Sequence, residues 1–379
     1  MVRILISVSV LLLILGGAIT YMARRSLALC PTFGRYPWVV WGFFGLFLAL
    51  MVIVPLVNRL ASHQADFFYW LSYGLFGFVS TYLVYLGVAD LAQFLARRLF
   101  QAPQSCSLLA FQLTLGAALC SVLIGLIMAV RQPSLKVVEV PISGLPHGLE
   151  GFRIVQISDL HLGPLVSTAK VDRLVARVNA VKPHLIAITG DLVDGEADGV
   201  RAKAERMAAL QATYGTLFVT GNHEYYSGIA KWVPVIRRLG WKQLDNQHVV
   251  IEHNSAQLVV AGMPDPASRG RRGSGTGPDL AMALANAPLE ATKVLLFHPP
   301  LGYQAAEAAN VALQLSGHTH SGQYFPWSLV VRSIYRFPKG LHRWGRMWVY
   351  TSVGTGFWGP PNRFLVPPEL TLVVLKRAQ

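Results

Sequence analysis

The sequence predicts an α/β globular domain preceded by an all-α membrane region, and three observations support this fold class. Of the 379 residues, 53% are hydrophobic and 14% are charged, whereas an ordinary soluble protein carries roughly 25% charged residues. Residues 1–130 contain two of the 19 acids and seven of the 33 bases, so the charge deficit lies in the N-terminal third. From Gly151 onward, apolar runs of strand length alternate with segments of helical spacing.

Four apolar segments in the N-terminal third are long enough to cross a bilayer. A spanning helix needs roughly 20 mostly apolar residues, and such helices are expected at 4–23, 37–57, 67–89 and 108–130. The alternative for the first segment is a cleaved signal peptide. Its long apolar core, the lack of an obvious small-residue cleavage pattern and the three further spans favour a membrane helix. Residues 1–130 are therefore the predicted transmembrane region.

The charges beside the spans bear on topology and on partners. The loops after the first and third spans carry five arginines, against four bases near the spans on the opposite side. By the positive-inside rule this margin of one favours an extracytoplasmic C-terminal domain in a multi-pass protein of the cell membrane. The net charge of +14 is compatible with nucleic acid or anionic lipid. Lipid headgroups are the simpler explanation for a multi-span protein, and no nucleic acid partner is expected.

The C-terminal part divides into residues 131–150, a linker with a first strand near 136–140, and a globular domain at 151–379. The first three strands of the domain are expected in "FRIVQISD", "HLIAITGD" and "LFVTGNHE", with helical segments between and after them. Further strands are expected near 241–252, 257–262, 293–298, 312–316, 346–352 and 370–376. Strands that alternate with helices are typical of a sheet with helices on its faces.

One segment, 322–345, is rich in aromatic and basic residues and interrupts this alternation. It is interpreted either as an ordinary packed loop or as a flap that contacts lipid. Its bases are then either solvated or available to an anionic headgroup; they are Arg332, Arg336, Lys339, Arg343 and Arg346.

Side chains that can bind metal ions follow five of the predicted strands. They are Asp159, His161, Asp191, Asn222, His298, His318 and His320. Each alone has a simpler interpretation, such as a turn residue, a helix N-cap or a core histidine. However, ligand sites of open α/β sheets form at the carboxyl ends of strands, and these side chains all follow strand ends. The set is too large for one tetrahedral zinc. It suits two divalent cations that share the Asp191 carboxylate, and imidazole with carboxylate favours Mn, Fe or Zn.

These residues lie in five short motifs that together resemble a known family. "DLH" at 159–161, "GDLVDG" at 190–195, "GNHEY" at 221–225, His298 and "GHTHSG" at 317–322 resemble, in order, the motifs of the calcineurin-like metallophosphoesterases. The tail "YTSVGTGFWGPPNRFLVPPEL" resembles the end of the branch that carries GHTHxGQ. In that branch a transmembrane N-terminus is common, and lipid-linked phosphoesters are among the substrates. The resemblance implies a four-layer α/β/β/α sandwich of two sheets.

The resemblance also implies a role for each motif residue. The implied ligands are Asp159, His161 and His320 for one metal, Asn222, His298 and His318 for the other, and Asp191 as the bridge. His223 would bind no metal and would act as general acid or stabilise the transition state. The expected catalytic residues are His223 and the neighbouring metal ligand Asn222. A hydroxide held between the metals would attack phosphorus in line.

The predicted function is hydrolysis of a phosphodiester or pyrophosphate by a membrane-anchored enzyme. A phospholipid or a lipid-linked nucleotide sugar is the candidate substrate. One alternative in the same chemical class is a nuclease or cyclic-nucleotide phosphodiesterase. An alternative of another class is a membrane sensor or transporter whose phosphoesterase-like domain only binds a ligand. Asp194 and Glu224 either support the metal ligands by hydrogen bonds or are solvated turn acids.

Overall fold

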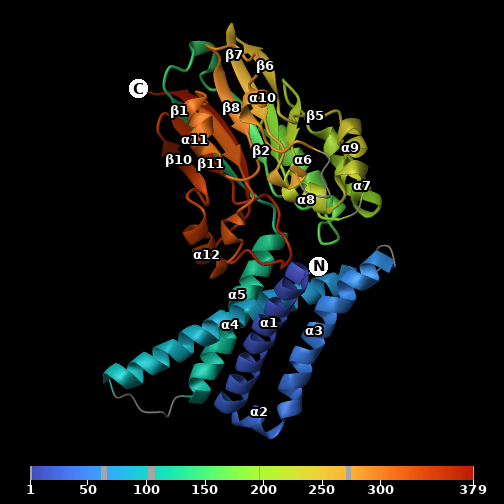
Figure 1. Cartoon of the computed structure of the whole chain (residues 1–379), viewed down its shortest axis with the longest axis vertical. Helices are drawn as coiled ribbons and strands as arrows, with labels where there is room; N and C mark the ends of the chain where they lie inside the picture. Colours follow the sequence, from blue (N-terminus) through green and yellow to red (C-terminus); the bar gives the residue numbers. More distant parts are fainter. Residues whose placement is uncertain (1, 61–65, 101–106, 196, 270–274, 379) are drawn as a thin grey trace. The chain divides into compact units, whose positions relative to one another are not determined.

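The computed structural model describes residues 2–60, 66–100, 107–195, 197–269 and 275–378 (Figure 1). The chain divides into two compact units. The first comprises Met1–Leu126 with Pro360–Asn362, and the second comprises Ile127–Gly359 with Arg363–Gln379.

The first unit is built from long apolar helices. They are α1 (Val2–Leu29), α3 (Pro37–Leu60), α4 (Asp66–Phe100) and α5 (Ser107–Val130), and the short helix α2 (Pro31–Arg35) follows α1. All four long helices are long and apolar enough to cross a membrane, which confirms the expected all-α region. Helix α4 continues beyond 89 to Phe100 because residues 90–100 are mostly good helix formers without Gly or Pro.

A polar cluster lies among these helices. The Arg25 guanidinium donates hydrogen bonds to both carboxylate oxygens of Asp90, one of them at 2.8 Å. The Tyr21 hydroxyl donates to the same carboxylate at 2.7 Å. A charge within a spanning helix is costly unless it is paired, so this cluster makes the burial of Arg25 and Asp90 in a bilayer tolerable.

The second unit contains two six-stranded sheets. The first has the order β1 (Ser134–Ile142), β12 (Glu369–Arg377), β2 (Arg153–Ile157), β3 (Leu185–Thr189), β4 (Thr216–Val219), β5 (Lys242–Gln243). The second has the order β10 (Gly340–Trp344), β11 (Met347–Thr351), β9 (Leu313–Ser316), β8 (Thr292–Leu296), β7 (Ala256–Gly262), β6 (Gln247–His253). Strands β2 to β5 are parallel, as are β7, β8, β9 and β11, so their carboxyl ends share an edge within each sheet.

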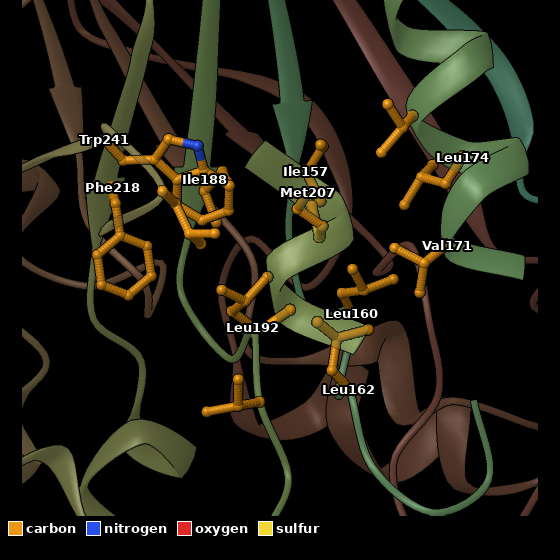
Figure 2. Packing of buried hydrophobic residues seen from close by; sticks show 14 of the residues in the cluster. Ile157, Leu160, Leu162, Val171, Leu174, Ile188, Leu192, Met207, Phe218 and Trp241 are labelled. Carbon is orange, nitrogen blue, oxygen red and sulfur yellow. The ribbon is translucent and has the colours of Figure 1, made fainter. Parts of the chain in front are cut away.

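The two sheets pack face to face, with helices on both outer faces, so the predicted four-layer α/β/β/α sandwich is confirmed. Successive strand residues point to opposite faces. Val155 and Ile157 of β2 therefore pack under the outer helices, whereas Ile154 packs between the sheets. The helices over the first sheet are α6 (Thr168–Ala180), α7 (Ala197–Glu205) and α9 (Ile229–Arg238); Figure 2 shows part of this packing. Those over the second sheet are α10 (Leu280–Ala283) and α11 (Tyr303–Ala308).

The segment 322–345 is not simply a loop, which corrects one of the two interpretations above. It contains helix α12 (Trp327–Ile334) and strand β10. Strand β10 pairs with β11 through a two-residue turn at Gly345 and Arg346, where Gly345 has φ +55°. Both elements are hard to recognise in the sequence, because α12 has only eight residues and β10 only five, and aromatic and basic residues surround them. Another short helix, α8 (Asn222–Tyr226), begins after the two residues that follow β4. Short 3₁₀ turns lie at His147–Leu149, Arg206–Ala209, Pro266–Arg269 and His320–Gly322.

Candidate metal centre

The metal-binding side chains expected from the sequence meet at one edge of the sandwich. Each follows the carboxyl end of a strand: β2 leads to Asp159 and His161, β3 to Asp191, β4 to Asn222, β8 to His298, and β9 to His318 and His320. The two sheets are joined at this edge by Gln156, whose side-chain amide donates to Thr189 Oγ1 at 2.8 Å and to the Ser316 carbonyl at 2.9 Å. The structure thus brings all seven predicted ligands together.

The first group of donor atoms comprises Asp159, His161 and His320. One atom from each lies within 4.8 Å of the others. The Nε2 atoms of His161 and His320 are 3.0 Å apart, and His320 Nε2 is 3.4 Å from Asp159 Oδ1. The Asp191 carboxylate approaches the same group, with 3.8 Å between its Oδ2 and His161 Nε2.

The second group comprises Asp191, Asn222, His298 and His318. His298 Nε2 lies 3.1 Å from Asp191 Oδ2. His318 Nδ1 lies 3.0 Å from Asn222 Oδ1 and 3.3 Å from His298 Nε2. Oδ2 of Asp191 is therefore the atom that faces both groups.

Hydrogen bonds at the far side of the rings orient the second group. Nδ1 of His298 donates to the Thr189 carbonyl at 2.7 Å, so Nε2 is the ring nitrogen that faces Asp191. Nε2 of His318 lies 3.1 Å from the hydroxyl of Tyr335, so Nδ1 faces the site. Partners of this kind hold metal-binding histidines in one tautomer and one orientation.

The donor set fits two divalent cations. Two imidazole nitrogens at 3.0 Å and a carboxylate oxygen at 3.4 Å point at one another, an arrangement that a shared cation stabilises. Burial lowers the pKa of His161 and of His318 to about 4, so both rings are neutral and keep a lone pair near neutral pH. The clustered histidines and aspartates can thus hold a pair of divalent ions, as the sequence predicted.

The Asp191 carboxylate is held ionised by the rings around it. Burial alone would raise its pKa, but the charge and hydrogen bond of His298 and the nearby His161 lower it below the usual range. In turn Asp191 raises the pKa of His298, although burial opposes that rise. A divalent cation held by these two side chains would replace the proton that stabilises the pair.

His223 lies beside the two groups and is paired with an acid. Its Nδ1 is 3.1 Å from Asp194 Oδ1, so Asp194 supports a site residue rather than acting only as a solvated turn acid. Burial by itself would lower the pKa of His223, but the Asp194 hydrogen bond and the charge of Asp191 raise it above the ordinary value. The rings of Tyr226 and Trp358 lie 5.4 and 5.7 Å from the His223 ring.

Glu224 is fully buried and binds the backbone that carries the bridge. One carboxylate oxygen accepts from the amides of Gly221 and Asp191 at 2.6 and 3.0 Å, and the other from Leu192 and Val193 at 2.7 and 3.3 Å. Consecutive residues of a helix point about 100° apart. On helix α8, Asn222 can therefore face a metal site, His223 can face the side from which substrate enters, and Glu224 can bind the loop after β3.

Glycines bring the site loops into close contact. Gly190 has φ +90°, a conformation that other residues adopt only with strain. A Cβ on Gly221 would stand 2.2 Å from Asp191 Oδ1, and one on Gly317 would stand 2.1 Å from Asp159 Oδ2. Gly190 thus allows the left-handed turn before Asp191, whereas Gly221 and Gly317 leave room for the carboxylates.

Several of the predicted ligands also have left-handed backbone conformations. The φ angles are 54° for Asp159, 49° for His161, 50° for Asp191, 68° for His318 and 46° for His320. For residues other than glycine this conformation costs roughly 1–2 kcal/mol each. Strain of this type concentrates at functional sites, where the surrounding structure enforces it.

The sequence analysis did not identify three residues that the structure places in or around the site. Tyr335 lies in the aromatic and basic segment 322–345, whereas Trp358 and Arg363 lie in the tail motif, to which the resemblance assigned no role. Arg363 is fully buried and donates hydrogen bonds to the carbonyls of Val353, Gly354 and Gly356. These bonds fix the loop whose Gly356 amide donates to the Asp159 carbonyl at 2.9 Å.

The chain is similar to several known proteins. Residues 152–322 match the calcineurin-like phosphoesterase family. A transmembrane protein with metallophosphoesterase domain from Danio rerio is 36% identical over 261 residues, which span 67% of this chain and 60% of that protein. An uncharacterized metallophosphoesterase of Campylobacter jejuni is 30% identical over 383 residues, which span 97% of each. The structure of a dimetal phosphatase from Danio rerio matches with a TM-score of 0.35 and 12% identity, covering 54% of this chain and 88% of that one.

The chain therefore belongs to the calcineurin-like phosphoesterase family. This is a family of phosphoesterases, and the clustered histidines and aspartates can hold divalent metals. The four apolar helices, together with relatives named as transmembrane proteins, indicate a membrane protein.

Proposed function

We propose that this protein is a membrane-anchored phosphoesterase that hydrolyses a phosphodiester or pyrophosphate bond at a pair of divalent cations. One observation carries the proposal: two groups of donor atoms converge, and Oδ2 of Asp191 faces both. In this assignment Asp159, His161 and His320 hold one cation. The second is held by Asn222, His298 and His318.

The bound cations would supply Lewis-acid stabilisation of the phosphoryl oxygens and lower the pKa of the attacking water. The chain itself supplies the proton chemistry at the other side of the substrate. His223 keeps Nδ1 on Asp194, which raises its pKa and leaves Nε2 as a donor. That atom can donate a proton to the leaving oxygen or a hydrogen bond to a phosphoryl oxygen. The rings of Tyr226 and Trp358 lie beside this histidine.

The test is metal content and turnover of the purified full chain, supplied with Mn²⁺, Fe²⁺ or Zn²⁺ in turn. Asp191→Asn is expected to lower the bound metal and to reduce turnover to background. Asp172→Asn, which changes an exposed acid on α6, is the matched control and should behave as the unmodified chain. Full metal content and full turnover in Asp191→Asn would contradict the proposed site.

The substrate we propose is a phosphoester of a membrane lipid, either a phospholipid or a lipid-linked nucleotide sugar. Four helices that can cross a bilayer, and relatives named as transmembrane proteins, support it. A panel of these lipids in vesicles, an oligonucleotide, a cyclic nucleotide and a soluble diester would decide the class. Turnover confined to the oligonucleotide or the cyclic nucleotide would overturn the lipid assignment and leave the hydrolase assignment intact. Binding without any turnover would favour a sensor.

We propose that the catalytic unit lies outside the cytoplasm, on the basis of the arginine count in the loops. A membrane-impermeant thiol reagent applied to intact cells tests this placement. A cysteine introduced at exposed Leu289 should be labelled before the cells are opened. Labelling only after lysis would reverse the topology.

A further inference from the structure

Helix α12 exposes large apolar side chains on its outer face. The exposed fractions are 53% for Leu329, 46% for Val330 and 68% for Ile334. At 100° per residue these three side chains share one arc of the helix, with Ser333 between them. Ser328 is the buried residue of this helix. An amphipathic helix of a soluble domain would turn such an arc toward the core, so this arc requires another explanation.

The helix is tied to the metal centre at both ends. At its C-terminal end, the Tyr335 hydroxyl lies 3.1 Å from His318 Nε2. Before its N-terminal end, the Gln323 side chain forms two hydrogen bonds of 2.7 Å with the backbone of Trp358. The ring of Trp358 contacts His223 and is 51% exposed.

A second exposed apolar residue borders the start of the helix. The Phe325 amide donates to the Phe364 carbonyl at 3.0 Å, which places Leu365 beside this segment, and Leu365 is 61% exposed. We refer to Leu329, Val330, Ile334, Trp358 and Leu365 together as the apolar rim. The apolar rim adjoins the site residues through Trp358 and Tyr335.

Positive charges accompany the apolar rim, and negative charges are missing from this part of the sequence. Arg332, Arg336 and Lys339 are exposed. The Arg336 guanidinium lies over the ring of Trp344, 4.8 Å from its centroid. No Asp or Glu occurs between Glu307 and Glu369, a stretch that includes the last metal-binding motif and all of the apolar rim.

We propose that the apolar rim inserts into the surface of a membrane that contains anionic lipid and thereby presents lipid phosphoesters to the metal centre. Apolar side chains next to Lys and Arg are the composition of helices that lie in the headgroup region of a bilayer. Charge complementarity selects anionic lipid over a protein partner. The lipid-substrate part rests on the proposed phosphoesterase function, whereas the membrane contact does not depend on turnover.

The contact is tested with a fluorophore on the full chain in lipid nanodiscs. In a background where Cys30, Cys106 and Cys120 are replaced by serine, a polarity-sensitive dye is attached to Ile334→Cys. Leu289→Cys is the control, because Leu289 is 86% exposed and precedes β8, at the strand end opposite the site. Spin-labelled lipid should quench the dye at 334 and leave the dye at 289 unaffected, and the quenching should increase with the fraction of anionic lipid. Equal, weak quenching at both positions would overturn the contact.

The consequence for the substrate is tested by turnover. The double variant Leu329→Asn with Val330→Asn should lower hydrolysis of a phospholipid in vesicles by at least about tenfold, as expected when two large apolar side chains leave a bilayer. The double variant should hydrolyse soluble bis-p-nitrophenyl phosphate at an unchanged rate. The control Leu289→Asn should hydrolyse both substrates at the rate of the unmodified chain. An unchanged lipid rate in the double variant would overturn the inference.

The two proposals fail in different ways. If the unmodified chain hydrolyses the soluble diester but no lipid, presentation of lipid is wrong and the phosphoesterase proposal stands. If no substrate is hydrolysed but the dye at 334 is quenched, the membrane contact stands and the proposed activity falls.

Discussion

Replacing Glu224 by glutamine tests whether the candidate site depends on its buried scaffold. The Glu224 carboxylate is an acceptor at both oxygens, and each oxygen receives two backbone amides. A glutamine side chain has the same shape but one oxygen and one NH₂ group. In either orientation of the amide, the NH₂ group faces two N–H groups that it cannot accept from.

The magnitude follows from this count. Two of the four hydrogen bonds are lost, and the corresponding N–H groups remain buried. Each unsatisfied buried group costs about 1–3 kcal/mol, so Glu224→Gln should destabilise the catalytic unit by about 2–6 kcal/mol. For a unit of this size, 1 kcal/mol corresponds to a shift in Tm of about 2–4 °C. A fall of roughly 10 °C is therefore expected, with the backbone of Asp191 displaced.

The first assay is thermal unfolding of the metal-free full chain in detergent, monitored by tryptophan fluorescence. The second assay is a metal titration at a temperature where the variant is folded. Because no metal is present during unfolding, the measured Tm reports the loss of the Glu224 hydrogen bonds and not a loss of metal binding. Glu290→Gln, at an exposed acid far from these amides, is the control and should leave both measurements unchanged. A Tm for Glu224→Gln within a degree or two of the unmodified chain would refute the reasoning.

Three further substitutions test separate parts of the structure. Tyr335→Phe removes the hydroxyl that orients His318 and should weaken binding of one metal by about 10–100-fold, measured by titration with Mn²⁺; an unchanged affinity would make this contact incidental. His223→Asn should keep the metal content and lower turnover by about 10²–10⁴-fold, whereas loss of metal would instead make His223 a ligand. Asp90→Asn should lower the Tm of the solubilised chain because Arg25 loses its partner, and adding Arg25→Gln should restore part of it.

Much of this protein could be predicted from local patterns. The four membrane helices were predictable because crossing a bilayer requires a long apolar segment, and 37–57 or 108–130 satisfies that requirement without any tertiary contact. The buried strands were predictable for a similar reason, since Leu185–Thr189 is apolar except for its last residue, as expected for a strand covered on both faces. The candidate ligands stood out because each follows such a strand.

Other features were not predictable because they arise from contacts across the sequence. Helix α12 is only eight residues long and lies among aromatic and basic residues, so its apolar arc did not stand out in the sequence. Tyr335 meets His318 only because the chain returns to the site after α12. Glu224 was recognised as a possible support, but its four amide donors come from two loops that follow different strands.

The sequence by itself determined which side chains are available for metal binding and which segments can enter a membrane, because composition and short-range spacing encode both. Only the tertiary structure decided how donor atoms from two sheets group around Asp191 and which apolar residues are left uncovered beside them. Those relations depend on the face-to-face packing of the two sheets, which brings their strand ends together at the site, and no local window of the sequence contains that packing.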